Sequence, residues 1–174
     1  MLTYTLALAQ TALEPAADGR PDAQSRAHAV AQTVQGILSY VRWPVEMTEM
    51  RLCIVGPTEY ADELTHVEQL PLSGGRRIIA RRYSIDEVPA DCDVVYVGVL
   101  SSADWRLLLR RIALRPVVTI GERREQCLAG GMFCLDVRDA DLSFEVNLDS
   151  VARSGVRVHP NVLQLGRRKG GHTP

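Results

Sequence analysis

The sequence predicts an α/β fold, with a Rossmann-like central sheet, helices on both faces and a C-terminal β-hairpin. Three apolar runs, at residues 51–56, 93–98 and 116–121, each stop at a glycine. Stretches with helical periodicity separate these runs, and that alternation is typical of a parallel sheet with both faces covered. After Gly121 the pattern changes to two strand-like runs, at 132–137 and 142–147, joined by a short polar link. This change predicts the hairpin.

The first predicted element is a helix over residues 25–41, which Pro44 closes. Its apolar residues recur on one helical face, and they are Val30, Val34, Ile37, Leu38 and Val41. The strand at 51–56 comes next, followed by a helix over 59–68 with Thr58 as its N-cap. A turn at Gly74 and Gly75 then leads into a strand over 76–83, nearer an edge of the sheet.

The later elements follow the same reasoning. The strand at 93–98 precedes a helix over 103–114, which Ser101 or Ser102 caps. After the strand at 116–121 and the hairpin, a short helix over 148–153 ends at Ser154-Gly155. Residues 156–158 form one more strand, and a last helical turn runs from 160 to 165.

Length and composition set the domain organisation. A chain of 174 residues suits one domain, which we expect to span 25–166. Residues 1–24 are interpreted as the remnant of a signal sequence or a flexible N-terminus, and 167–174 as a flexible basic tail. The chain has 20 Lys+Arg against 21 Asp+Glu, so it lacks the basic excess of a nucleic-acid or anionic-membrane binder. Its 46% hydrophobic content argues against a disordered chain.

The four cysteines are the sharpest feature of the sequence. Cys127 and Cys134 flank a short loop in which Gly130 and Gly131 supply a bend, so a local disulfide there needs little chain closure. A second bridge, between Cys53 and Cys92, is reasonable because both lie on segments that could be neighbours in the sheet. Such bonds persist in an oxidising compartment. The alternatives are four reduced structural cysteines in the cytosol, or a redox enzyme that cycles Cys127 and Cys134.

Motifs for a cofactor, a metal or catalysis are not found. No Gly-x-Gly-x-x-Gly or Gly-x-x-x-x-Gly-Lys follows a strand, and no Cys-x-x-Cys spacing suggests zinc. Ser154 and His159 would need an oxyanion hole and a charge partner to form a hydrolase site, and the sequence supplies neither. The sequence therefore predicts a protein that is not an enzyme and needs no cofactor.

A group of charged residues suggests a binding site instead. If residues 156–159 are extended, Arg157 and His159 share one face, and Arg42 is a third cation that folding could bring near. Together they could bind a small anion or a ligand carboxylate, or form an ion-pair network with Glu145. The alternative is a set of solvated charges beside the edge of the core.

The chain resembles the YfiR family of bacterial periplasmic proteins. The matching stretches are 36–44, 52–56, 125–134, 144–149 and 152–160. This resemblance implies a non-enzymatic repressor that binds the periplasmic domain of an inner-membrane diguanylate cyclase (YfiN) and holds it inactive. An outer-membrane lipoprotein (YfiB) would sequester the repressor and release cyclic-di-GMP synthesis, which governs biofilm formation. The resemblance also implies an α/β homodimer with the disulfides Cys53–Cys92 and Cys127–Cys134.

A repressor of this kind needs an adhesive surface with apolar anchors and a polar rim. Phe133 is the first candidate anchor, because neighbouring Cys134 would point to the opposite face of the sheet. Glu145 and Val151 are candidate neighbours. The alternative is that Phe133 belongs to the core, since the chain has only two Phe to fill its interior.

Overall fold

The computed structural model describes residues 23–66, 70–138 and 141–167. The helices are α1 (Ala23–Ser39), α2 (Asp62–His66), α3 (Ser102–Ile112), α4 (Glu125–Leu128), α5 (Leu148–Ser154) and α6 (Val162–Arg167), with a 3-10 turn η1 (Ile85–Glu87). The strands are β1 (Val41–Arg42), β2 (Glu49–Val55), β3 (Leu70–Pro71), β4 (Arg77–Tyr83), β5 (Val94–Val97), β6 (Val118–Gly121), β7 (Phe133–Arg138), β8 (Asp141–Val146) and β9 (Arg157–Val158).

The main sheet has seven strands in the order β3-β4-β2-β5-β6-β7-β8. The five inner strands run parallel, whereas β3 and β8 are antiparallel edge strands. The predicted hairpin of β7 and β8 is confirmed, and it extends the main sheet because β7 pairs with β6. The α/β prediction with helices on both faces is also confirmed.

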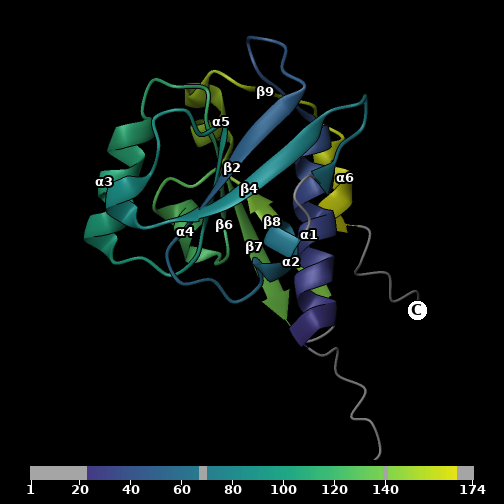
Figure 1. The fold of residues 1–174 in the computed structure, drawn as a ribbon, viewed down its shortest axis with the longest axis horizontal. Helices are drawn as coiled ribbons and strands as arrows, with labels where there is room; N and C mark the ends of the chain where they lie inside the picture. The colour runs from purple at the N-terminus through teal and green to yellow at the C-terminus, as the bar shows by residue number, and fades with distance from the viewer. Residues whose placement is uncertain (1–22, 67–69, 139–140, 168–174) are drawn as a thin grey trace, which may run out of the picture.

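Alternation along the inner strands divides the core into two layers. On β5, Val94 and Tyr96 belong to the larger apolar cluster, whereas Val95 and Val97 belong to the smaller one on the other face. Buried residues of α1 and α2 complete the larger cluster, and α3 contributes Trp105, Leu108 and Ile112 to the smaller one. Figure 1 accordingly shows α1, α2 and α6 on one side of the sheet and α3 on the other.

A separate two-stranded ribbon joins an early and a late segment of the chain. Strands β1 and β9 pair antiparallel, with Val41 opposite Val158 and Arg42 opposite Arg157. The sequence predicted β9 but not β1, since two residues directly after a helix carry too short a pattern. The ribbon places the segment after α1 beside the segment after α5, and α6 packs against α1 (Figure 1).

The helix expected over 59–68 is wrong at its start. Helix α2 begins at Asp62, so Thr58 lies too far from its start to cap it, and the Thr58 hydroxyl accepts a hydrogen bond of 2.7 Å from Arg82 Nη1. The backbone N–H groups of Glu59 and Tyr60, which a helix start would leave to a cap, instead donate to the Glu122 carboxylate.

Some expectations lie outside the described residues. The predicted signal-sequence remnant (1–24) and basic tail (167–174) lie outside them for the most part. Only 23–24, which belong to α1, and 167, which belongs to α6, are described. The end of the 59–68 helix and the hairpin link at 139–140 also lie outside them.

Candidate functional site

The crevice in which Rossmann-like sheets bind ligands lies at the carboxyl ends of the strands where the strand order reverses. Here that point falls between β2 and β5, and the chain itself fills it. The Pro57 carbonyl accepts a 2.7 Å hydrogen bond from the Val99 N–H. A Cβ on Gly98 would lie 1.9 Å from the same oxygen, so only glycine allows this backbone contact. The glycine that ends β5 therefore serves close packing, not the approach of a phosphate.

The next strand end is closed by a side chain. Gln126 Nε2 donates to the Gly98 carbonyl over 2.8 Å, and its Oε1 accepts from the Arg123 N–H. A Cβ on Gly121 would lie 2.2 Å from that Oε1 atom. Both glycines thus make room for groups of the protein, which agrees with the lack of a nucleotide-binding motif.

Beside this closed crevice lies a buried carboxylate that the sequence did not single out. Glu122 directly follows β6 and is only 5% exposed. It accepts hydrogen bonds of 2.8 Å from the N–H groups of Glu59 and Tyr60 and of 2.9 Å from the Tyr96 hydroxyl. Three donors satisfy the charge, so the burial is physically tolerable. Glu122 ties the loop after β2 to the centre of the sheet.

The two tyrosines of this cluster hold their protons strongly. Burial, followed by the hydrogen bond and charge of Glu59, raises the pKa of Tyr60 to about 12. Burial and the neighbouring Glu122 carboxylate raise the pKa of Tyr96 well above its ordinary value. Both hydroxyls therefore remain protonated donors at neutral pH. The cluster behaves as a fixed structural brace, with Tyr96 Oη donating to Glu122.

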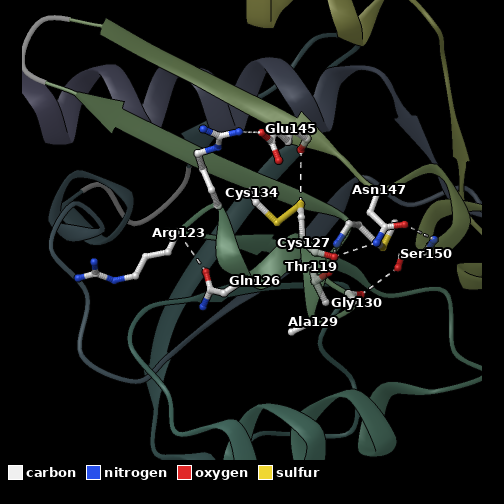
Figure 2. The surroundings of a disulfide bond; sticks show 12 residues. Thr119, Arg123, Gln126, Cys127, Ala129, Gly130, Cys134, Glu145, Asn147 and Ser150 are labelled. Atoms are coloured by element: carbon white, nitrogen blue, oxygen red, sulfur yellow. Dashed lines mark hydrogen bonds and ion pairs between the residues drawn. A yellow bond between two sulfur atoms is a disulfide. The ribbon is translucent and has the colours of Figure 1, made fainter.

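Both predicted disulfides are confirmed. Cys53 on β2 bridges to Cys92 just before β5, with a Cα–Cα distance of 6.0 Å, and Cys127 in α4 bridges to Cys134 on β7, at 5.7 Å. The first bridge belongs to the smaller core cluster, beneath α3. The second holds α4 against the start of the hairpin, as Figure 2 shows. All four cysteine sulfur atoms are in bridges, so the structure has no reduced cysteine.

Three side chains hold the loop between Cys127 and Cys134: Asn147 and Ser150 at the start of α5, which Figure 2 shows, and Trp105 of α3. Asn147 Nδ2 donates to the Cys127 carbonyl over 2.9 Å, Trp105 Nε1 to the Ala129 carbonyl over 2.9 Å, and Ser150 Oγ to the Gly130 carbonyl over 3.0 Å. Each of these loop carbonyls thus has a partner from outside the loop.

The predicted partner-binding residues do not share one environment. Phe133 is 0% exposed and packs edge-on against Phe144, with ring centroids 6.1 Å apart. It is therefore a core residue. The prediction that Phe133 anchors a surface contact is wrong for this conformation, because its side chain points into the larger core cluster. Glu145 is exposed on β8 and forms an ion pair with Arg124. Val151 on α5 is half-buried against the larger core cluster.

Three of the four predicted ligand-binding residues do come together. Arg42, Arg157 and His159 line one open groove of about 610 Å³ over the β1–β9 ribbon. His159 Nδ1 accepts a hydrogen bond from the Asn161 N–H, which leaves Nε2 as the donor of the neutral ring. Glu145 does not line this groove, and its carboxylate pairs with Arg124 instead.

The groove carries an excess of positive charge, because the register of β1 and β9 places two arginines opposite each other. Arg42 and Arg157 are direct partners across the ribbon, and like charges in that position repel each other. Arg42 and Arg76 both donate to the carbonyls of Ser39 and Val41, at the carboxyl end of α1. Burial and then the charge of Arg42 lower the pKa of Arg76. An anion in the groove would relieve this repulsion.

Within residues 23–66, 70–138 and 141–167, no three His, Cys, Asp or Glu side chains gather in a way that could hold a metal ion. The helices of these same ranges are all too short or too polar to cross a membrane.

The fold is α/β with two disulfides, and the chain itself fills the crevice between β2 and β5. These two features distinguish the chain from nucleotide-binding Rossmann proteins. The sequence profile described as DUF4154, YfiR/HmsC-like, matches residues 27–167, and the chain belongs to that family. The resemblance seen in the sequence is thereby confirmed. The family comprises periplasmic regulators of signalling, and in that general sense the chain is a signalling regulator.

Proposed function

We propose that this chain is a non-enzymatic periplasmic regulator that represses a YfiN-like inner-membrane diguanylate cyclase by binding its periplasmic domain. Sequestration by a YfiB-like outer-membrane lipoprotein relieves the repression, so that the chain controls cyclic-di-GMP and biofilm formation. The observation that carries this proposal is the family match over residues 27–167. The two disulfides support the periplasm as the compartment, because such bonds persist under oxidising conditions. A homodimer is part of the proposal.

The exposed Glu145, with Val151, is proposed as part of the partner contact. Glu145 already pairs with Arg124, and an exposed ion pair of this kind contributes little to folding. A carboxylate at that position can therefore exchange Arg124 for a cation of the partner at small cost to stability. Phe133 lies in the core and, one residue from the partner of Glu145 on β7, faces the opposite side of the sheet, so it is not part of this proposed contact.

The test compares a deletion strain with strains that carry the wild-type chain, E145K, or the swapped pair R124E/E145K. Deletion should raise cyclic-di-GMP and wild type should restore the low level. E145K should fail to repress, and the swapped pair should fail equally although its internal ion pair is rebuilt. Thermal melting verifies that both variants are folded. Unchanged cyclic-di-GMP on deletion contradicts the repressor function, whereas repression by the swapped pair contradicts only the role of Glu145.

A second candidate function is a binding module for small anions or carboxylates, and the groove of Arg42, Arg157 and His159 favours it. Anions that bind the folded state raise its melting temperature by mass action. We expect phosphate and small carboxylates to raise the melting temperature of the wild-type chain. R157Q should abolish this increase, whereas R81Q, a change at an exposed arginine outside the groove, should leave it intact. Equal shifts for wild type and R157Q would show that the groove is not the site.

A further inference from the structure

A strained residue marks a surface that the proposed contacts do not use. Leu114, two residues after α3, has φ +63° and is the only non-glycine with positive φ within the described ranges. Its side chain is 100% exposed. A left-handed conformation costs a leucine roughly 1–2 kcal/mol, which glycine would avoid. The left-handed turn ends α3 directly after its C-cap Ala113, a position that glycine usually fills. Helix termination therefore accounts for the turn but not for the exposed leucine side chain.

Leu114 stands at the mouth of a pocket of about 300 Å³ between the end of α3, the Cys127–Cys134 loop and α5. Apolar side chains from α3, from the residue just before β6 and from the loop form much of its wall, and they are Leu109, Ile112, Val117 and Met132. The hydrogen bond from Ser150 Oγ to the Gly130 carbonyl joins the loop wall to the α5 wall. The pocket is therefore a preformed feature between braced elements.

Two cations border this apolar pocket. Arg115 follows Leu114, and Arg153 lies in the last turn of α5. Among the residues that the structure describes, Arg153 has no carboxylate within ion-pair distance. Arg115 makes no direct ion pair either, although it lies near enough to Asp93 for the two charges to attract each other. The pocket thus combines apolar walls, an exposed leucine and two positive charges that are not held in direct ion pairs.

We propose that this pocket docks an extended segment of a partner protein that carries one apolar side chain next to a carboxylate. The apolar side chain enters between Ile112 and Met132, Leu114 packs over it, and the carboxylate pairs with Arg115 and Arg153. A concave pocket of this size suits a side chain, whereas a lipid bilayer would favour a convex or flat basic face. This inference rests on the proposed function in one respect: a regulator that binds two different partners needs more than one binding surface.

The experiment titrates the full-length, oxidised chain with the capped peptide acetyl-Asp-Leu-Glu-amide and follows backbone amide signals by NMR. The expected result is a set of shifts at Leu114, Arg115, Met132 and Arg153. Acetyl-Asn-Leu-Gln-amide should bind about tenfold more weakly, a ratio that corresponds to about 1.4 kcal/mol. R115E/R153E should abolish binding, and the matched reversal R81E/R106E, at two exposed arginines outside the pocket, should not change it.

Leu114→Gly separates function from stability. It should weaken peptide binding several-fold while leaving the melting temperature unchanged or higher, because glycine removes the backbone strain. Shifts remote from the pocket, or equal affinity for the two peptides, would overturn the proposal. So would binding to vesicles of phosphatidylglycerol and phosphatidylethanolamine that R115E/R153E abolishes while the peptides fail to bind. Because the probe is a peptide, its outcome is independent of whether the chain represses a cyclase.

Discussion

At the scale of single residues, Glu122 has the largest structural consequence for its size. Its two carboxylate oxygens receive three hydrogen bonds, from two consecutive backbone N–H groups and from the Tyr96 hydroxyl. The backbone donors belong to the loop between β2 and α2, and Tyr96 lies in the middle strand β5. The Glu122 carboxylate therefore fixes the loop between β2 and α2. It binds the backbone N–H groups of Glu59 and Tyr60, and α2 begins only at Asp62.

Glu122→Gln tests this brace. Glutamine keeps the shape, but its amide group turns a donor toward the Glu59 N–H, which leaves buried donors without an acceptor. We expect the free energy of unfolding to fall by about 1–3 kcal/mol in urea titrations at neutral pH. Tyr96→Phe, which removes one donor and keeps the charge satisfied by two others, should cost less, about 1 kcal/mol. A change below about 0.5 kcal/mol for Glu122→Gln, which is typical of surface substitutions, would refute this role.

Residues with strong local chemistry were predictable, and residues whose role depends on distant partners were not. The cysteine pairs followed from short spacing and from strands that the apolar runs placed side by side. Glu122 carried no such signal, because a charged residue after a strand is normally a solvated loop residue. Its donors lie 62 and 63 residues away in the chain, and only the completed sheet brings them together. For a similar reason the sequence does not decide between surface and core for Phe133, since its contact with Phe144 exists only after β7 and β8 pair.

At the scale of elements, the long apolar strands and amphipathic helices were predictable because burial repeats over many residues. Helix α3 illustrates this, since its Ser101 cap accepts from the Asp104 N–H as expected and its apolar face is buried. The short elements β1 and β3 have two residues each, too few for any period to show. The β1–β9 ribbon follows from tertiary pairing, and the candidate groove of Arg42 and Arg157 exists only because of it.

The glycines that end the strands show how one sequence signal can have two physical meanings. A glycine after a strand permits close approach by a phosphate or by the protein itself. The sequence could not separate these cases beyond noting that no complete nucleotide motif is present. The structure separates them, because Pro57 and Gln126 occupy the space in front of Gly98 and Gly121.

At the scale of the whole molecule, the two disulfides divide the task of stabilising the fold. The bridges close separate stretches of chain, 53–92 and 127–134, with sequence separations of 39 and 7. Loop-closure entropy then assigns about 4 kcal/mol to the first and about 2.5 kcal/mol to the second. Domains of this size have a total stability of about 5–15 kcal/mol. The fold therefore depends on its redox compartment.

This division predicts an ordered series of variants. C127A/C134A should lower the free energy of unfolding by about 2.5 kcal/mol and C53A/C92A by about 4 kcal/mol. The fourfold variant should lose about 6.5 kcal/mol, because the two loops do not overlap and share no partner, a condition under which separate effects add. Urea unfolding followed by circular dichroism, without reductant, measures all three, and wild type with reductant should match the fourfold variant.

The hydrogen bonds from Asn147, Trp105 and Ser150 should keep the 127–134 loop in place in C127A/C134A. A fourfold variant as stable as wild type would show that non-covalent packing alone holds the sheet and that folding does not depend on an oxidising compartment.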